Sequence, residues 1–527
     1  MILQGKRVAL PAAPVVHRKF EANVDATPDA VAVFWAGQEV TYAELDVKAN
    51  RFAHFLAARG HGRGAKVGVC LDYSIDMLVA ILGTLKAGAA YVPFDPAYPT
   101  ARLELLLGQV PDLALIVASP ATAAMVESAK AEAVDLQQLA DELAALPAAR
   151  PDVAVTGDDI CYAVFTSGST GTPKLTAVRH EGWFNLMNWL TVEYGLTGES
   201  NHLVVSAFGF DLSQRSLMTP LFCGATQNLM ASRNFDAMMA YRLLSERGIR
   251  VVHCASSTLY LLVDWETARR GDALTKLDYV LFGGEALKAE RLTDWMRREG
   301  NTCTLLHQYG VAECTDVATS YDLANHRPGE QAVPPVGTPA YNTGVHLLDE
   351  ELRGVAPGEP GEIYISGASV GAGYLNNGPE NAKFTTIEVD GEPLRAYRTG
   401  DRGHVNEAGE LIVLGRIDSQ VKVRGMRIDP NDIERALARL DGVREAAVVV
   451  TYTDSGEAEL SAFIVPAGED LAENDLRAGL LETLPRNMVP ARFTNIPVIP
   501  LSPNGKVDRA ALAAESSRQY ATSGTAA

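Results

Sequence analysis

Between about residues 40 and 320, stretches with helical apolar spacing alternate with short apolar runs that end in glycine. Within residues 74–88, apolar residues recur at helical intervals (Leu78, Ile81, Leu82 and Leu85), which predicts a helix. The runs LDYVLFGGEAL (277–287) and TLLHQYG (304–310) have the composition of buried strands. This alternation is typical of an α/β protein whose parallel strands carry a ligand cleft at their carboxyl ends.

The pattern changes after about residue 325. Short strand-like runs separated by turn residues, GEIYISG (361–367), ELIVLG (410–415) and QVKVRG (420–425), predict an antiparallel or barrel-like subdomain. The Ala/Glu-rich segment 121–150 predicts peripheral helices on the large domain.

From residue 418 onward, the chain predicts a compact α+β unit. Its expected elements are a helix over 429–440, strands over 446–451 and 459–465, and a helix over 475–484. The expected fold class is therefore α/β. A large N-terminal domain (1–417) of α/β subdomains plus a barrel-like subdomain would precede a small, mobile α+β C-terminal domain (418–527).

Charge and cysteine content exclude several classes of protein. A net charge of -19 and a pI near 5.0 argue against nucleic acid or anionic membranes as partners, because both require a basic surface. Six cysteines without a CxxC pair indicate neither a disulfide framework nor a zinc site. The amino-terminal apolar run is short and interrupted by prolines, and no segment approaches a membrane span, so we expect a cytoplasmic protein.

The segment TSGSTGTPK (166–174) follows an apolar run and is the most informative motif of the chain. Interleaved hydroxyls and glycines allow backbone N–H and side-chain O–H groups to surround a polyphosphate, and Lys174 adds a positive charge. The spacing is not that of a Walker A loop. Taken alone, the segment is also compatible with an ordinary flexible loop.

Further motifs occur in a fixed order along nearly the whole chain. They are TYAELD (41–46), LKAGAAYVPFDPAYP (85–99), FDLS (210–213), YGVAE (309–313), GEIYISG (361–367), YRTGD (397–401), GRIDSQVKVRGMRID (415–429), LPRNMVP (484–490) and NGKVDR (504–509). Together with the 166–174 loop, this series resembles the core motifs of nonribosomal peptide synthetase (NRPS) adenylation domains, which belong to the acyl-adenylate-forming (ANL) superfamily.

The resemblance implies an enzyme that uses ATP and Mg²⁺ to join an amino acid to AMP. Lys506 resembles the lysine that bridges substrate carboxylate and α-phosphate, Lys174 belongs to the phosphate loop, and Glu313 resembles the Mg²⁺ ligand. The other implied nucleotide-binding residues are Thr166, Ser167, Gly168, Ser169, Thr170, Gly171, Gly283, Gly284, Glu285, His307, Tyr309, Gly310, Asp401 and Arg416.

The chain departs from the family pattern at several positions. Val311 and Ala312 replace a proline and a threonine, and the threonine hydroxyl would contact phosphate. One hydrogen bond to a charged group contributes about 1.5–3 kcal/mol, so its loss is expected to slow the reaction without abolishing it. His307 stands where an asparagine often meets adenine, and Leu175 replaces the glycine after the loop lysine.

Asp211 resembles the aspartate that pairs with the α-amino group of an amino acid substrate. The other implied pocket residues are Leu212, Arg215, His253, Leu281, Gly283, Gln308, Asp316 and Val317. Arg215 with His253 or Gln308 would grip a second carboxylate or a carboxamide. Asp316 leaves two alternatives open, since it either pairs with Arg215 or contacts a distal amine or hydroxyl. Acidic or amide side chains are favoured, and hydroxylated or basic ones remain possible.

The family's two half-reactions imply a mobile C-terminal domain and a partner. Asp418 resembles the hinge residue, about which the domain would rotate between a pose that delivers Lys506 and one that brings the loop near Gly425 to the acceptor. The acceptor would be the phosphopantetheine thiol of a carrier protein in natural-product or antibiotic biosynthesis. No condensation motif precedes the core and few residues follow Leu512, so we expect loading in trans by a free-standing or excised domain, with an MbtH-like protein as a further possible partner.

Three alternatives share parts of this pattern. An acyl-CoA synthetase has the same first half-reaction, but Asp211 speaks against it. A D-alanine:carrier ligase is disfavoured by the charged pocket. A catalytically silent carrier-docking module is the third, because Ala312 marks a departure from the family.

Overall fold

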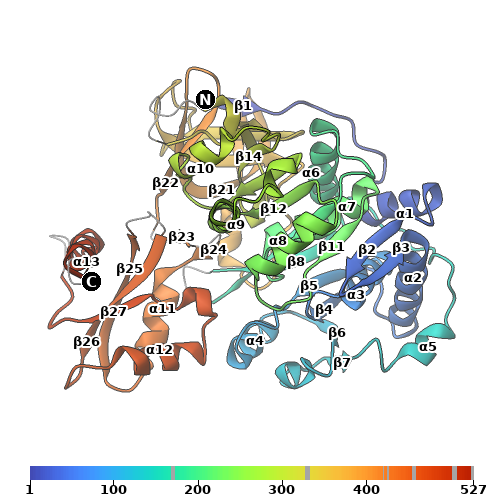
Figure 1. Cartoon of the computed structure of the whole chain (residues 1–527), viewed down its shortest axis with the longest axis horizontal. Helices are drawn as coiled ribbons and strands as arrows, with labels where there is room; N and C mark the ends of the chain where they lie inside the picture. The colour runs from blue at the N-terminus through green and yellow to red at the C-terminus, as the bar shows by residue number, and fades with distance from the viewer. Residues whose placement is uncertain are drawn as a thin grey trace.

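The computed structural model describes residues 1–167, 172–326, 333–418, 420–423, 426–453, 458–500 and 507–523 (Figure 1). A large N-terminal α/β domain precedes a small C-terminal domain, as the sequence predicted. The helices of the large domain are α1 (Val16–Ala26), α2 (Tyr42–Ala58), α3 (Ile75–Lys86), α4 (Thr100–Leu107), α5 (Ala140–Ala144), α6 (His180–Glu193), α7 (Asp211–Cys223), α8 (Ala237–Glu246), α9 (Ser256–Arg269) and α10 (Glu290–Met296). None of the helices in the described ranges is both long and apolar enough to cross a membrane.

The larger of two mostly parallel sheets has nine strands. In spatial order they are β16 (Thr338–Pro339), β15 (Thr319–Asp322), β14 (Thr304–Tyr309), β13 (Tyr279–Gly283), β12 (Val251–Ala255), β10 (His202–Val204), β11 (Gln227–Leu229), β2 (Val31–Trp35) and β3 (Gln38–Thr41). The strands from β14 to β2 run parallel, whereas the pairings β14–β15, β15–β16 and β2–β3 are antiparallel. The two strands predicted from LDYVLFGGEAL and TLLHQYG are confirmed as the parallel neighbours β13 and β14.

The second sheet has seven strands and carries the phosphate-loop motif. Its order is β19 (Gly373–Tyr374), β9 (Lys174–Arg179), β8 (Ile160–Thr166), β5 (Ala90–Pro93), β4 (Lys66–Cys70), β6 (Leu113–Ala118) and β7 (Glu132–Val134). The prediction of helices alone over 121–150 is wrong in part, because β7 lies between a 3₁₀ turn and α5. Alanine and glutamate favour helix, but pairing with the edge of β6 satisfies the β7 backbone.

A third, antiparallel sheet matches the expected change after residue 325. It contains β1 (Ile2–Gln4), β17 (Thr343–Leu348), β18 (Gly361–Gly367), β21 (Glu392–Val405) and β20 (Phe384–Val389), with β22 (Leu411–Arg416) on β21. The run QVKVRG does not belong to this sheet. Its β23 (Val421–Val423) pairs with β24 (Met426–Ile428) in a separate two-stranded ribbon.

The C-terminal domain has the predicted α+β composition. Its elements beyond the ribbon are α11 (Pro430–Leu437), β25 (Val443–Tyr452), β26 (Ala458–Pro466), α12 (Glu473–Leu481), β27 (Arg492–Asn495) and α13 (Arg509–Ser523). The helix α13 and the strand β27 were not predicted. Figure 1 shows this domain, in orange and red, to one side of the large domain, with β23 and β24 between them.

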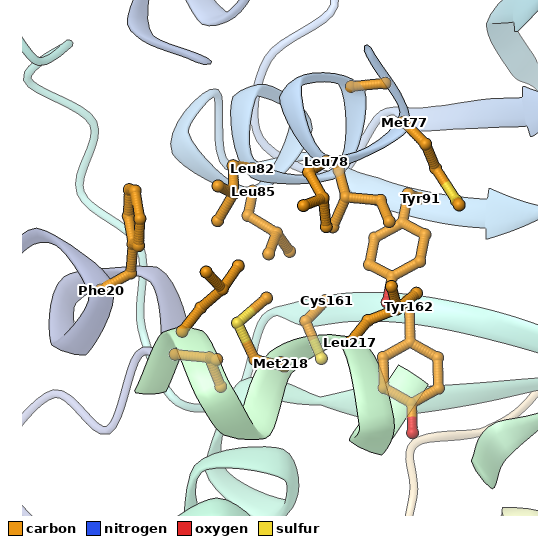
Figure 2. Packing of buried hydrophobic residues seen from close by; sticks show 14 of the residues in the cluster. Phe20, Met77, Leu78, Leu82, Leu85, Tyr91, Cys161, Tyr162, Leu217 and Met218 are labelled. Atoms are coloured by element: carbon orange, nitrogen blue, oxygen red, sulfur yellow. The ribbon is translucent and has the colours of Figure 1, made fainter. Parts of the chain in front are cut away.

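The core of the large domain positions α7. Figure 2 shows Leu78, Leu82 and Leu85 of α3 facing Leu217 and Met218 of α7. Every α3 residue except Asp76 is buried, and the α7 residues from Ser213 to Phe222 are buried as well. Because interior side chains are close-packed, this contact holds the amino-terminal turn of α7 in place.

Candidate active site

A cavity of about 140 Å³ lies at the amino-terminal end of α7 and at the carboxyl ends of β8, β13 and β14. The rest of its wall comes from Tyr98, Arg102 and Leu106 at and just before α4, from the β23–β24 ribbon, and from Pro485 and Met488 of the C-terminal domain. Carboxyl ends of parallel strands are the usual ligand-binding edge of an open α/β sheet. Both domains therefore contribute to one candidate site.

Glu313 lies in the 3₁₀ turn directly after β14 and is fully buried in the cavity wall. The Tyr374 hydroxyl donates to its Oε1 at 2.7 Å, and Nη1 of Arg427 lies 3.4 Å from each carboxylate oxygen. Burial alone raises the pKa of a carboxyl group, but Arg427, Tyr374 and Lys174 outweigh it and lower the pKa of Glu313 to about 2. The side chain is therefore an anion at neutral pH.

Lys174 is the first residue of β9, and its side chain is fully buried. Its Nζ donates to Oε2 of Glu380 at 3.1 Å and lies 5.2 Å from the centre of the Tyr374 ring. Burial lowers the pKa of Lys174, and the charge of Glu313 opposes that shift. Two cations from separate elements, Lys174 of β9 and Arg427 of β24, thus act on the Glu313 carboxylate.

The first two residues of the phosphate-loop motif, Thr166 and Ser167, lie on the cavity wall. Thr166 ends β8, and the Ser167 hydroxyl donates to the backbone oxygen of Arg427 at 3.0 Å. Four predicted loop residues, Gly168, Ser169, Thr170 and Gly171, lie outside the described residues, as do Lys506 and Gly425.

Tyr309 ends β14 and connects the cavity to Asp401. The Tyr309 hydroxyl donates to Oδ2 of Asp401 at 2.8 Å, and Nη1 of Arg416 donates to Oδ1 at 3.0 Å. Arg416 also forms two hydrogen bonds with Asp418, at 2.8 and 2.6 Å. Nζ of Lys422 lies 5.6 Å from the centre of the Tyr309 ring. Four predicted residues, Tyr309, Asp401, Arg416 and Asp418, thus form one continuous network.

Two glycines allow the backbone of β13 to line the cavity. Gly283 needs to lack a side chain, since a Cβ there would lie 2.1 Å from the backbone oxygen of Gln308. Gly284 has a φ of +85°, in the region that favours glycine. Close packing of β13 against β14 therefore requires glycine at position 283, and both glycines line the cavity beside Tyr309.

Asp211 and Arg215 lie one helical turn apart in α7, and both line the cavity. Burial raises the pKa of Asp211, while a hydrogen bond from the backbone N–H of Leu212 opposes the shift. Nε of Arg215 lies 2.8 Å from Oδ2 of Asp316, and Nη1 of Arg215 donates to Oε1 of Gln308. Asp316 thus pairs with Arg215 in this structure, the first of the two alternatives for this residue.

Some predicted site residues do not reach the cavity. Leu212, Gly310 and Val317 line it, whereas Leu281 and His253 are buried outside its wall. The His253 ring instead stacks on His202, with 5.3 Å between ring centres.

Glu285, His307, Asp401, Arg416 and Lys174, all predicted to bind nucleotide or phosphate, also lie outside the cavity wall. Nδ1 of His307 lies 2.9 Å from the backbone oxygen of Pro335, and Glu285 accepts a hydrogen bond from the backbone N–H of Ser257 at 2.8 Å.

Lys422 and Arg427 were not predicted as site residues, although both line the cavity. These residues are directly opposite each other in the β23–β24 register, so their side chains share one face of the ribbon. Two cationic side chains opposite each other on a short hairpin predict an anionic partner, so the sequence did contain a pattern that indicates this part of the site. Their partners, Glu313 and Asp401, come from distant parts of the chain.

Comparison with known proteins is consistent with this geometry. Residues 20–375 match the family model described as "AMP-binding enzyme", and residues 432–506 match "AMP-binding enzyme C-terminal domain". The chain belongs to the AMP-binding enzyme family. This confirms the predicted resemblance and makes the protein an adenylate-forming ligase.

The curated relatives of this AMP-binding enzyme are much longer proteins. It is 35% identical over 514 residues to a dimodular nonribosomal peptide synthase of Bacillus subtilis (strain 168), covering 94% of this chain and 21% of the relative. It is 32% identical over 514 residues to bacitracin synthase 3 of Bacillus licheniformis, covering 97% of this chain but 8% of that protein. The chain therefore spans a small part of the relatives that it matches.

Solved structures share the fold over nearly the whole chain. PA1221, an NRPS protein containing adenylation and PCP domains, has a TM-score of 0.81 and 28% identity, with 95% of this chain and 84% of that chain covered. The amide bond synthetase McbA from Marinactinospora thermotolerans has a TM-score of 0.84 at 24% identity, covering 95% of this chain and 99% of that chain. The second likeness shows the shared fold alone.

Proposed function

We propose that this AMP-binding enzyme activates an amino acid with MgATP and transfers it to the phosphopantetheine thiol of a carrier protein. In the first step, a substrate carboxylate oxygen attacks the α-phosphorus of ATP and pyrophosphate leaves. In the second, the thiol attacks the acyl carbon and AMP leaves. The observation that carries the proposal is the placement of Asp211, Glu313 and Tyr309 around one cavity at the strand ends.

The Asp211 carboxylate supports an amino acid as substrate. It starts α7 and lines the cavity, so a substrate ammonium group placed there would meet an opposite charge. A fatty or aryl acid has no group for this position. We therefore favour aminoacyl-adenylate formation over acyl-CoA synthesis.

The residues present fit a Mg²⁺ ion held together with the phosphates of ATP. Mg²⁺ usually takes one or two carboxylates and completes its shell with water and phosphate oxygens. Glu313 supplies one buried anionic carboxylate, and no group of three or more acidic, histidine or cysteine side chains suited to a metal occurs within the described ranges. When bound, the ion would neutralise phosphate charge, while Lys174 supports the same region from β9.

The proposed second step involves the C-terminal domain. We place the domain division at Asp418, so that 1–417 binds the substrates and 418–527 rotates. In one orientation, rotation would bring Lys506 to the reacting groups for the first step. In the other, it would bring the side of the domain that carries the β23–β24 ribbon to them for the second step. Arg427 already contacts Glu313 in the present pose, which supports close approach of this ribbon to the reacting groups.

The remaining elements of the proposal concern the setting of the enzyme. We place it in the cytoplasm and in peptide natural-product biosynthesis. An MbtH-like protein is proposed as an additional partner beside the carrier. Its need is tested by measuring activity with and without such a protein.

Amino-acid-dependent exchange of labelled pyrophosphate into ATP tests the proposal. Exchange with a particular amino acid, followed by acylation of a phosphopantetheinylated carrier, is the expected result. Formation of a free CoA thioester in preference to carrier loading would favour an acyl-CoA synthetase. Absence of exchange with every amino acid would favour a silent docking module.

A further inference from the structure

The Arg215–Asp316 pair lies in the wall of the cavity that receives the substrate side chain in the proposed function. Its two side chains are 2% and 11% exposed, so both charges are largely removed from solvent. A buried charge is tolerated when it is paired, and these two form an ion pair at 2.8 Å, although Arg215 Nε and Asp316 Oδ2 have no hydrogen-bond partner among the described residues. When Asp316 is ionised, the pair therefore presents no net charge to the ligand.

The structure holds Asp316 in this position through an unusual turn. Thr315 and Asp316 both have left-handed backbones, with φ values of +57° and +69°. The Thr315 hydroxyl donates to the backbone oxygen of Ser369 at 2.6 Å, and a Cβ on Gly310 would lie 1.9 Å from the backbone oxygen of Asp316. Non-glycine residues in this region persist where surrounding contacts enforce them, and they cluster at functional sites.

Gln308 adds a second observation that points to a ligand. Its Oε1 accepts a hydrogen bond from Arg215, but its amide nitrogen Nε2 is buried with no hydrogen-bond partner among the described residues. The residue is 3% exposed and lines the cavity. Because buried donors are almost always satisfied, this nitrogen requires an acceptor from a ligand or from water.

Resting on the proposed function, we infer that the activated amino acid has a side chain ending in an uncharged group with both hydrogen-bond donors and acceptors, such as a carboxamide or a ureido group. Its carbonyl oxygen would accept from Gln308 Nε2 and the Arg215 guanidinium. Its N–H group would donate to the Asp316 carboxylate. Neither buried charge would then lose its partner.

Charged side chains fit this arrangement less well. A substrate carboxylate would lie against Asp316 and compete with it for Arg215, and a substrate ammonium would lie against Arg215. Asp211 also faces this part of the cavity but is assigned to the α-amino group. An apolar side chain would leave Gln308 Nε2 without an acceptor.

The test is pyrophosphate exchange by the full chain with matched amino acids. Glutamine is compared with glutamate, asparagine with aspartate, and citrulline with arginine, and kcat/KM is measured for each. We expect an uncharged member to exceed its charged partner by about 10- to 100-fold, as for a hydrogen bond to a charged group. Asp316→Asn should reduce the preference of glutamine over glutamate, or of asparagine over aspartate, by at least about tenfold, because it removes the repulsion.

The outcomes separate the inference from the proposed function. Preference for an acidic, basic or apolar amino acid would overturn the inference and leave amino acid activation standing. An unchanged amide-to-acid ratio in Asp316→Asn would also overturn it. Silence with every amino acid would contradict the proposed function itself and the inference with it. The wild-type comparison decides the matter even where the variant fails to fold.

Discussion

Among the single residues of the site, several charges lie next to an opposite one. Glu313 is anionic inside the protein because Arg427, Tyr374 and Lys174 surround it. Asp401 accepts from Tyr309 and Arg416, and Arg215 faces Asp316. Asp211 differs, since its Oδ1 accepts from the backbone N–H of the next residue instead of from a cationic side chain, which leaves it suited to a substrate cation.

Asp211→Asn is the direct test of the assigned amine contact. The change keeps the shape of the side chain but removes its charge, so we expect the KM for the amino acid to rise by about 10- to 100-fold. The KM for ATP should change little. Steady-state exchange kinetics measure both values, and Asp264→Asn, at a 62% exposed surface aspartate, is the control. Equal effects on the two substrates would remove Asp211 from amine recognition.

The charge of Asp316 should affect stability in a defined pH range. Burial raises the pKa of Asp316 to about 7, with Arg215 and Lys422 opposing the shift and Asp211 adding to it. The pKa of this group is about 4 in the unfolded chain. At a pH between that pKa and the higher pKa in the folded chain, the folded chain binds more protons than the unfolded chain. The contribution of this group to the free energy of unfolding therefore falls as pH rises from about 4 to about 7 and is constant above that range.

Urea unfolding of the wild type and Asp316→Asn across this pH range checks the prediction. The difference in unfolding free energy between the two proteins should change between about pH 4 and 7 and then level off. If the unfolding free energies of the two proteins changed in parallel over this pH interval, Asp316 would have the same pKa in the folded and unfolded chains. That result would contradict the prediction.

At the scale of elements, the contact between α2 and α3 illustrates a conflict between helix propensity and packing. Gly83 lies inside α3, where alanine is favoured over glycine by about 1 kcal/mol. A Cβ at Gly83, however, would lie 2.9 Å from the backbone oxygen of Ala49 and 2.7 Å from Cδ1 of Phe52. The backbone of α2 cannot move away without disturbing the core that supports α7.

We therefore expect Gly83→Ala to lower the free energy of unfolding by about 1–3 kcal/mol, against the trend of helix propensity. Gly479→Ala in α12 is the matched control, because the nearest atoms there all belong to the flexible side chain of Leu440. Chemical denaturation measures both variants. A Gly83→Ala protein as stable as the wild type would show that α2 and α3 can separate freely.

At the scale of the whole molecule, the β23–β24 ribbon joins the C-terminal domain to the cavity. Arg427 contacts Glu313, and its backbone oxygen accepts from Ser167 at 3.0 Å. Oε1 of Gln420 accepts from Arg427 at 2.6 Å and from Arg416 at 3.1 Å. In this pose, a guanidinium occupies the surroundings of the carboxylate that we propose as the Mg²⁺ ligand.

Arg427→Gln should weaken the hold of the C-terminal domain on the large domain. Small-angle X-ray scattering is expected to give a larger radius of gyration for the variant than for the wild type. Adding Mg²⁺ and ATP should expand the wild type by competing for Glu313, with a smaller effect on the variant. Arg435→Gln, which breaks an ion pair within the C-terminal domain, is the control. Identical scattering from wild type and Arg427→Gln would exclude this contact as a constraint on the pose.

Local sequence patterns predicted many of the elements and part of the site. Helical spacing predicted α3, apolar runs ending in glycine predicted β13 and β14, and ordered motifs predicted the family. These features are local, because backbone periodicity and turn chemistry depend on nearby residues. Sequence analysis likewise placed Asp211, Arg215 and Glu313 in the site.

The pairing of the charges, in contrast, depends on the folded chain. Arg215 meets Asp316, and Arg427 meets Glu313, across about a hundred residues of chain, and β23 left the sheet to which its pattern had assigned it. Coulomb energy depends on distance and burial, which sequence spacing does not contain. For that reason, motifs sufficed to name the reaction class, whereas the neutral character of the inferred substrate side chain follows from the folded arrangement of its pocket.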